Sequence, residues 1–252
     1  MTLEVRKLTM EFDGLKALQN VDIQIAKGAI HAIIGPNGSG KTTLFNCISG
    51  IYHPTIGRIL FKQKNIEGLK PFQVAEMGIS RTFQNIRLFR TMNVLDNVLV
   101  GQHYRTREGF LANALKLGKI GREEERVKEK ALQTLKLVGL ENKAFRHATE
   151  LPYGDRRLLE LARALASDPE VLLIDEPTSG MNETETMQTM EIIGGIRERG
   201  ITVLLVEHHM KVVMGISDRV SVLDHGEKIA DGTPYEIQTD ERVIEAYLGR
   251  KK

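Results

Sequence analysis

A glycine-rich segment with one lysine and two threonines has the composition of a phosphate-binding loop. Residues 35–43 read Gly-Pro-Asn-Gly-Ser-Gly-Lys-Thr-Thr and fill every fixed position of the pattern G-x-x-x-x-G-K-[ST]. Glycine lets the backbone turn tightly and point successive N–H groups at phosphate oxygens. We expect Lys41 to reach the β- and γ-phosphates and the Thr42 hydroxyl to ligate Mg²⁺. The residues expected to bind a nucleoside triphosphate are Asn37, Gly38, Ser39, Gly40, Lys41, Thr42 and Thr43.

Two carboxylates, Asp175 and Glu176, close the apolar run 171–174. Ligands of a doubly wound sheet bind at the carboxyl ends of its strands. Asp175 can hold Mg²⁺ through water, and Glu176 can polarise an attacking water as a general base. An apolar run that ends in Asp-Glu also occurs in ordinary surface strands. A functional role for Asp175 and Glu176 is supported by a second apolar run, 201–206, which is followed by Glu207 and His208.

Apolar runs and helical periodicity predict the elements that position these residues. Residues 29–34 predict a buried strand before the glycine-rich loop, and residues 42–48 predict a helix after it. Further strands are expected at 3–10, 21–26, 57–61, 171–175, 201–206 and 218–223, and helices at 183–199 and 209–216. The pattern from 94 to 166 is helical, so a doubly wound core is interrupted by a helical insertion.

Two helix starts carry reciprocal capping residues. Asn182 is followed three residues later by Glu185, and Thr233 is followed by Pro234 and then Glu236. In this arrangement each side chain bonds the backbone N–H of the other residue. We therefore expect helices to begin directly after Asn182 and Thr233.

Composition indicates an ordinary soluble globular protein. The 252 residues are 27% charged and 41% apolar, with a net charge of +2, and no basic stripe is interleaved with aromatic residues. The apolar runs are too short to span a bilayer, and the N-terminus lacks an apolar signal core, so a cytosolic location is expected. The single cysteine, Cys47, lies in an apolar helical pattern and is expected to be a small buried residue.

The order of these motifs resembles that of the ATP-binding-cassette (ABC) ATPases over nearly the whole chain. The resemblance implies an α/β fold: a P-loop NTPase core with an N-terminal antiparallel β subdomain and an inserted ABC-type helical subdomain. It implies one ABC ATPase domain over 1–252. Within it, 1–83 and 167–252 form the nucleotide-binding core and 84–166 the helical subdomain.

The resemblance also assigns roles to isolated residues. Phe12 takes the place of the aromatic that stacks on adenine, Gln84 that of the glutamine that senses Mg²⁺ and the attacking water, and His208 that of the histidine at the γ-phosphate. Taken singly, each has a structural alternative as a core, surface or hydrogen-bonded residue. The resemblance implies that Glu176, His208, Gln84 and Lys41 are catalytic and that Thr42, Gln84 and Asp175 hold the metal.

Leu151-Pro152-Tyr153-Gly154-Asp155 corresponds to the family signature L-S-G-G-Q and departs from it at three positions. In the family, the signature of one subunit covers the ATP held by another, so Gly154 is implied to act in trans. Pro152 supplies neither hydroxyl nor N–H, Tyr153 adds bulk, and Asp155 brings negative charge near phosphate. Either the signature is impaired, or it works through Gly154 amides and the helix dipole.

Residues 80–89, the helical insertion and the ending 243–249 resemble one branch, the ATPase subunits of branched-chain amino acid importers. The implied function is an ATP-hydrolysing, energy-coupling subunit at the cytoplasmic face of the membrane, with ATP and Mg²⁺ as cofactors. The implied partners are a second ATPase subunit, expected to be a different chain, two membrane-spanning permease subunits and, indirectly, a substrate-binding protein. No nucleic-acid partner is expected. Arg87, Leu88 and Phe89 either face a membrane partner or pack within the subdomain.

Two other functions remain open at this stage. One is a soluble ABC ATPase in a nucleic-acid or ribosome-associated machine, which would need paired cassettes, coiled-coil arms or basic patches. The other is an ATP-dependent sensor whose turnover is low because of Pro152 and Tyr153. The transported amino acid is not specified by this chain, because separate proteins select it.

Overall fold

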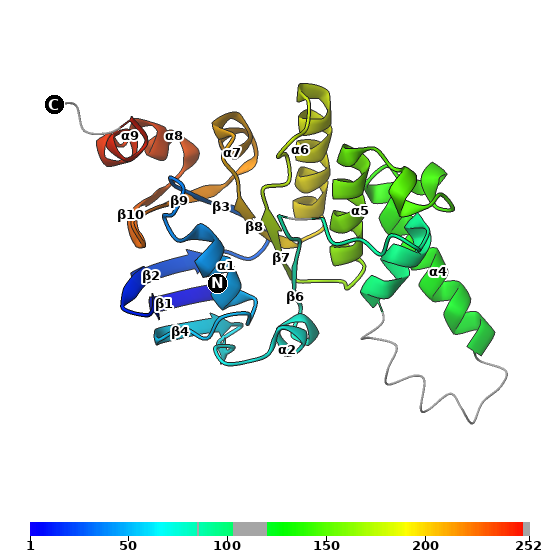
Figure 1. The fold of residues 1–252 in the computed structure, drawn as a ribbon, viewed down its shortest axis with the longest axis horizontal. Helices are drawn as coiled ribbons and strands as arrows, with labels where there is room; N and C mark the ends of the chain where they lie inside the picture. The colour runs from blue at the N-terminus through cyan, green and yellow to red at the C-terminus, as the bar shows by residue number, and fades with distance from the viewer. Residues whose placement is uncertain (85, 103–119, 249–252) are drawn as a thin grey trace.

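The computed structural model describes residues 1–84, 86–102 and 120–248. Its centre is a six-stranded sheet in which neighbouring strands are parallel, except for one antiparallel pair at the edge (Figure 1). In spatial order the strands are β10 (Glu227–Gly232), β9 (Arg219–Asp224), β3 (Ile30–Ile34), β8 (Thr202–Val206), β7 (Val171–Asp175) and β6 (Ile79–Arg81). This order places β3, which leads into the glycine-rich loop, at the middle of the sheet.

The central strands β3, β7 and β8 are buried along their whole length. Alternate residues of β7 enter two different cores, Leu173 on one face and Leu172 on the other. Strands covered on both faces read as continuous apolar runs, which explains why the sequence predicted them well. In register, Val206 lies opposite both Ile33 and Asp175, so the carboxyl ends of the three strands meet at one edge.

A second, antiparallel sheet packs beside the first. Its strands, in spatial order, are β2 (Leu15–Ile25), β1 (Leu3–Phe12), β4 (Ile56–Phe61) and β5 (Lys64–Asn65). The helix α1 (Lys41–Ile48) lies between the two sheets, and its Phe45 shares a core with Leu3 of β1 and Leu204 of β8. The glycine-rich loop is thereby held between two rigid layers.

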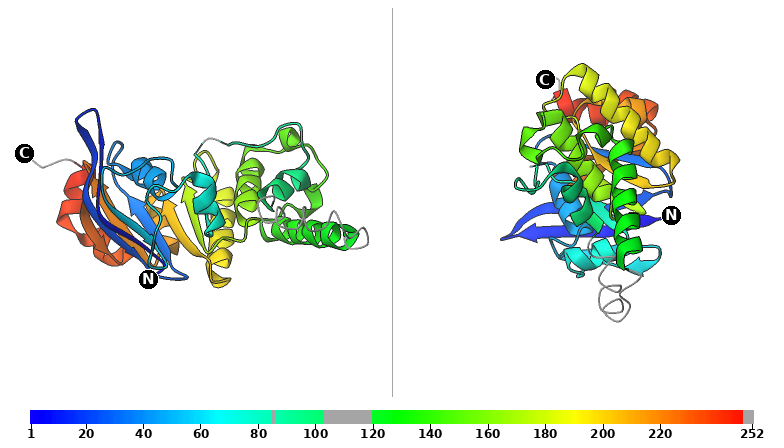
Figure 2. Two further views of the ribbon diagram at one scale, coloured as in Figure 1. Left: turned by 90° about the horizontal axis from the view of Figure 1, so that it is seen from below. Right: turned by 90° about the vertical axis from the view of Figure 1, so that its right-hand side faces the viewer.

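The helices α4 and α5 form a lobe away from the antiparallel sheet (Figures 1 and 2). Their core joins Leu135 of α4 and Leu158 of α5 to Leu172 of the parallel sheet. Besides α1, the described helices are α2 (Pro71–Glu76), α4 (Ile120–Leu137), α5 (Tyr153–Leu165), α6 (Glu183–Glu198), α7 (Met210–Ile216), α8 (Pro234–Thr239) and α9 (Glu241–Leu248), with residues 94–102 also helical. Two short 3₁₀ turns, Glu141–Lys143 and Ala148–Glu150, precede α5.

The predicted fold class and both capped helix starts are confirmed. Asn182 accepts a hydrogen bond from the Glu185 N–H at 2.9 Å, and Thr233 accepts one from the Glu236 N–H at 3.4 Å. Cys47 is buried, and burial raises the pKa of its thiol to about 12, as suits a small apolar residue. None of the described helices is both long and apolar enough to cross a membrane.

Several boundaries differ from those predicted. Strand β2 begins at Leu15 and not at residue 21, because a tight turn at Asp13 and Gly14, both with positive φ, pairs the mostly exposed residues 15–20 with β1. Strand β6 and helix α2 are too short, and strand β10 is too polar, to be recognised in the sequence. The insertion is interrupted between 138 and 152. Residues 103–119 of the insertion, like Asn85 and Gly249 of the branch motifs, lie outside the described residues, and the subdomain bounds at 84 and 166 stay a prediction.

Candidate active site

The glycine-rich loop joins β3 to α1 and leaves the helix N-terminus without a side-chain cap. Gly40 precedes α1 with φ of 101°, and a Cβ there would lie 2.6 Å from the Ala17 carbonyl oxygen, so no larger residue fits. The first turn of α1 carries no acidic residue. Its backbone N–H groups and the positive end of the helix dipole are therefore available to an anion. This arrangement fits a triphosphate.

Lys41 is buried beneath its own loop. Its Nζ donates to the carbonyl oxygens of Gly35, at 2.8 Å, and of Pro36, at 2.9 Å. Burial lowers the pKa of Lys41, and the carboxylates of Glu176 and Asp175 oppose that shift. The two carbonyl bonds satisfy the ammonium group within the loop, close to where the motif places phosphate.

The other predicted loop residues differ in exposure. Asn37, Gly38 and Thr42 are exposed, Thr43 is half-buried, and Ser39 is buried. The Ser39 hydroxyl oxygen is among the buried atoms without a hydrogen-bond partner. The Thr42 hydroxyl is thus placed where a bound cation can reach it.

Glu176 is held by two donors from different elements. His208 Nε2 lies 2.6 Å from Glu176 Oε1, which requires the proton on Nε2, and the Gln84 amide donates to Oε2 at 2.9 Å. Glu176 itself has φ of 48°, a left-handed conformation that is uncommon for non-glycine residues. The structure therefore brings together three residues that are separated in the sequence by up to 124 positions, Gln84 to His208.

Asp175 forms a buried ion pair that the sequence did not reveal. Arg81 Nη2 donates to Asp175 Oδ2 at 3.1 Å, while Nη1 bonds Asn46 Oδ1 at 2.7 Å. Burial raises the pKa of Asp175, and the Arg81 guanidinium lowers it. The same guanidinium lies over the rings of Phe45 and Phe83. Arg81 thus offsets the cost of burying the carboxylate and fixes its orientation.

A second residue to which the sequence analysis assigned no role is Glu207, which is buried and directly follows β8. It accepts hydrogen bonds from the Thr178 hydroxyl at 2.8 Å and from the His208 N–H at 2.8 Å. His209 turns toward Thr178, with 3.3 Å between its Nδ1 and the hydroxyl oxygen, whereas His208 turns toward Glu176. Glu207 thereby fixes the backbone from which His208 extends. Its position at the end of an apolar run was the available signal.

The predicted metal ligands offer oxygen atoms, which Mg²⁺ prefers. Among the described residues, no group of three or more His, Cys, Asp or Glu side chains can hold a metal by itself. Mg²⁺ in nucleotide sites is bound through one or two carboxylates together with substrate phosphates and water. Asp175, the Thr42 hydroxyl and the Gln84 amide oxygen form a donor set of that kind. The residues therefore fit a cation that arrives with a triphosphate.

Phe12 and Gly154 come from elements other than those that carry Glu176. Phe12 ends β1 and is 38% exposed, with its ring edge-on to Tyr52 at 5.2 Å between centroids. Gly154 is buried in the first turn of α5, where a Cβ would lie 2.8 Å from Glu185 Oε1. Stacking on adenine by Phe12 and an action of Gly154 in trans stay predictions.

The signature residues that depart from the family pattern contact their own chain. Pro152 stands at the N-cap of α5 and gives no side-chain cap. Asp155 forms an ion pair with Lys143, which offsets the negative charge that the sequence analysis placed near phosphate. The Tyr153 ring lies against Gly180, where a Cβ would be 3.1 Å from the ring. The charge of Asp155 is therefore paired, and the ring of Tyr153 is packed, within this chain.

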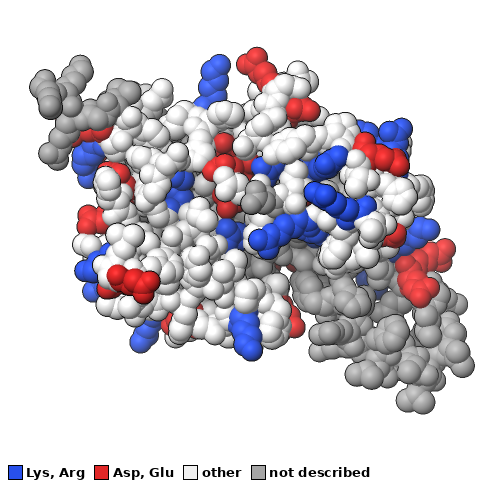
Figure 3. Space-filling view, viewed as in Figure 1, with Lys and Arg blue, Asp and Glu red and all other residues white. Residues whose placement is uncertain are grey.

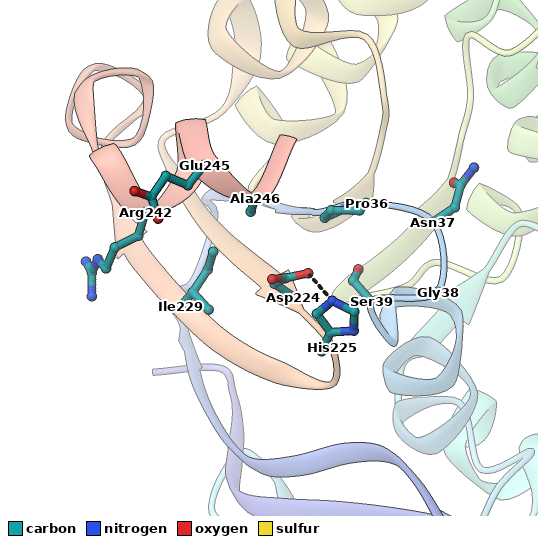
Figure 4. A pocket seen from close by; sticks show the side chains of 10 residues that line it. All are labelled: Pro36, Asn37, Gly38, Ser39, Asp224, His225, Ile229, Arg242, Glu245 and Ala246. Carbon is teal, nitrogen blue, oxygen red and sulfur yellow. Dashed lines mark ion pairs between the residues drawn. The ribbon is translucent and has the colours of Figure 1, made fainter. Parts of the chain in front are cut away.

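A pocket of about 580 Å³ lies between the glycine-rich loop and α9 (Figure 4). Residues 36–39 of the loop form one wall, and Ile229, Arg242, Glu245 and Ala246 line the other side. Asp224 and His225, an ion pair at 3.8 Å, lie between the two walls. Glu176 and His208 do not line this pocket, so the pocket is separate from the cluster of Glu176, His208 and Gln84.

Comparison with known proteins identifies the class. The family model described as "ABC transporter" matches residues 18–179, and the model described as "Branched-chain amino acid ATP-binding cassette transporter" matches residues 227–252. The chain belongs to the ABC transporter family and is an ABC ATPase.

Individual relatives cover nearly the whole chain. LivG of Salmonella typhimurium (strain LT2), a high-affinity branched-chain amino acid transport ATP-binding protein, is 45% identical over 248 residues, covering 98% of this chain and 97% of the relative. BraF of Pseudomonas aeruginosa, with the same description, is 44% identical over the same shares. Two crystal structures of ATP-binding cassettes of ABC transporters superpose with TM-scores of 0.86 (nucleotide-free, 33% identical) and 0.85 (ADP conformation, 31% identical), each covering 99% of both chains.

Proposed function

We propose that this chain hydrolyses ATP to drive an importer of branched-chain amino acids at the cytoplasmic face of a membrane. The observation that carries the proposal is that His208 and Gln84 each hydrogen-bond one carboxylate oxygen of Glu176, at the strand ends beside the phosphate loop. The names of LivG and BraF and the match at residues 227–252 support the branched-chain assignment.

The residues divide the work of phosphoryl transfer to water. The loop N–H groups and Lys41 bind the phosphates, and Lys41 exchanges its bonds to Gly35 and Pro36 for phosphate oxygens. Glu176 accepts the proton of the attacking water, and His208 and Gln84 orient its carboxylate. Phe12 stacks on the adenine ring. Thr42, Asp175 and Gln84 would hold Mg²⁺, which would supply positive charge against the β- and γ-phosphates.

The active form is a dimer in which the signature of each subunit covers the nucleotide of the other, with Gly154 acting in trans. The second ATPase subunit is a different chain. Pro152 and Tyr153 lack the hydroxyl and the small size that the signature needs at the partner's nucleotide, whereas the residues around Glu176 match the family pattern. The full assembly adds two permease subunits and a substrate-binding protein that delivers the amino acid.

The permeases dock beside the segment that follows Gln84. Arg87 and Phe89 are exposed there, whereas Leu88 packs against the helical core. Figure 3 shows basic side chains gathered over the area that Figure 1 gives to this segment and to α5. An acidic or aromatic segment of a permease suits this surface.

ATP turnover by the complex purified from membranes tests the proposal. Lys41→Ala removes the cation at the β- and γ-phosphates and is expected to abolish hydrolysis and to weaken ATP binding about tenfold or more. Arg199→Ala, at the exposed end of α6, is the matched control and keeps the parental rate. Parental hydrolysis by Lys41→Ala would contradict the mechanism. If the intact complex binds ATP tightly and hydrolyses almost none, the alternative function is favoured, an ATP-dependent sensor whose turnover is low because of Pro152 and Tyr153.

A further inference from the structure

Side chains on one face of α5 hydrogen-bond the backbone on both sides of Gln84, at Phe83 and Arg87. Arg157, Glu160 and Arg163, spaced three residues apart, share this face, which we call the α5 ladder. Arg157 Nη1 donates to the Phe83 carbonyl at 3.3 Å, and Arg163 donates to the Arg87 carbonyl.

Glu160 lies between the two arginines of the ladder, and its Oε1 is 3.8 Å from Arg163 Nη2. Burial raises the pKa of Glu160, and the charge of Arg163 and then the N–H groups of Arg87 and Phe83 oppose this shift. The ladder thus contacts both ends of the chain segment that carries Gln84.

Arg157 also binds the signature. It is 8% exposed, and its Nε and Nη2 donate to the Tyr153 hydroxyl at 3.2 and 3.0 Å. Tyr153 is in turn seated against Gly180, in the segment that follows Glu176. One guanidinium therefore joins the tyrosine of the signature to the carbonyl that precedes Gln84.

The position of the Phe83 carbonyl constrains Gln84, because the two belong to one planar peptide unit. The Gln84 side chain then reaches Glu176 Oε2 at 2.9 Å. A displacement of the Phe83 carbonyl by about 1 Å is enough to lose such a hydrogen bond, and misplacement of this size costs enzymes up to about a hundredfold in rate.

We propose that Arg157 is a positioning residue, oriented by the Tyr153 hydroxyl, that sets Gln84 against Glu176. Tyr153, which stands where the family has glycine, then has a role of its own, because its hydroxyl holds Arg157 in place. The consequence for hydrolysis rests on the proposed function, but the ordering of the segment around Gln84 does not depend on it.

The test combines backbone amide exchange with kinetics. Arg157→Met keeps the length of the side chain and removes its donors, and Tyr153→Phe keeps the ring on Gly180 and removes only the hydroxyl. Arg197→Met, which breaks an exposed ion pair to Asp218, controls for the loss of an arginine. Amide exchange is measured on the nucleotide-free chain at Phe83, Gln84 and 86–89, and turnover on the assembled complex.

Arg157→Met is expected to speed exchange in this segment several-fold and to lower kcat about tenfold, with KM for ATP within about twofold of the parent. Tyr153→Phe is expected to give a smaller change in the same direction. The double variant is expected to equal Arg157→Met alone, because Tyr153 acts through Arg157. Arg157→Lys, which keeps a donor, is expected to restore part of kcat.

Unchanged exchange in both single variants would overturn the proposal, and so would additive losses in the double variant. If Arg157→Met does not fold, Tyr153→Phe decides by itself, since it removes a single oxygen. If the parent complex lacks ATPase activity, the proposed function fails, whereas the exchange measurement still decides whether Arg157 orders the segment.

Discussion

Glu176 and His208 face each other from the ends of neighbouring parallel strands, with 2.6 Å between Glu176 Oε1 and His208 Nε2. Gln84 donates to the other carboxylate oxygen, so both oxygens of the proposed general base are held in place. The left-handed backbone at Glu176 shows that the surrounding structure imposes this placement.

Glu176→Gln should keep ATP binding and stop hydrolysis, because the amide preserves the shape of the side chain and cannot accept a proton. General-base catalysis contributes about 10²- to 10⁴-fold, so a loss of turnover of at least that size is expected. Single-turnover hydrolysis measures the loss, and chromatography of the variant together with the second ATPase subunit, ATP and Mg²⁺ should show a stable dimer. Glu183→Gln in the first turn of α6 is the control. Two subunits that stay apart in the presence of ATP would count against the dimer.

Phe12→Ala should weaken ATP binding by about 1 kcal/mol and leave the melting temperature nearly unchanged, since the ring is partly exposed and its loss removes a stacking face. Titration calorimetry and thermal unfolding separate the two effects. Leu15→Ala, which trims an exposed residue paired with Phe12 across the same hairpin, should leave affinity unaltered. A large fall in stability with unchanged affinity would instead make Phe12 a core residue.

His31 should make the fold less stable as the pH falls from 6.5 toward 4. The buried ring contacts Ser221 at 2.8 Å, and Ser221 donates its proton to Asp231, so neutral His31 donates from Nε2. Burial lowers the pKa of His31 to about 4, and Arg219 and Lys228 add to this effect while Asp231 opposes it.

The unfolded chain, with a histidine pKa near 6.5, therefore binds more protons across that window, and about 3 kcal/mol is lost. Urea unfolding at pH 7, 6 and 5 measures the slope. His31→Gln should flatten it, whereas His225→Gln, whose side chain is 95% exposed in the parent, should not. An equal slope in His31→Gln and the parent would refute this assignment.

Pro152→Ser should stabilise the chain and activate the partner's site. A serine at the N-cap of α5 can accept a hydrogen bond from the helix, which is worth about 1 kcal/mol in thermal unfolding. In the assembled complex, with Glu176→Gln silencing this chain's own site, turnover at the partner's site should rise several-fold, because a hydroxyl donor is restored. Pro152→Ala is the control. Equal turnover in the Ser and Ala variants would contradict the asymmetric dimer.

The sequence by itself determined the features that depend on neighbouring residues. The order of glycines, Lys41 and Thr42 specifies a phosphate loop, because backbone conformation and helix start are local properties. The apolar runs of β3, β7 and β8 and the capping pair of Asn182 and Glu185 were predicted for the same reason: local pattern and burial agree.

Only the tertiary structure decided which distant residues meet. The ion pair of Arg81 with Asp175, separated by 94 positions, and the bond of Arg157 to the Phe83 carbonyl, separated by 74, have no local signature. An arginine side chain suits solvent, an ion pair or an aromatic contact, and a tyrosine side chain suits solvent, a hydrogen bond or an aromatic contact. The packing of α5 against the sheet selects among these. The sequence therefore identified the groups that we propose for the chemistry, and the fold determined what holds them in place, because contacts between distant elements depend on the arrangement of whole elements.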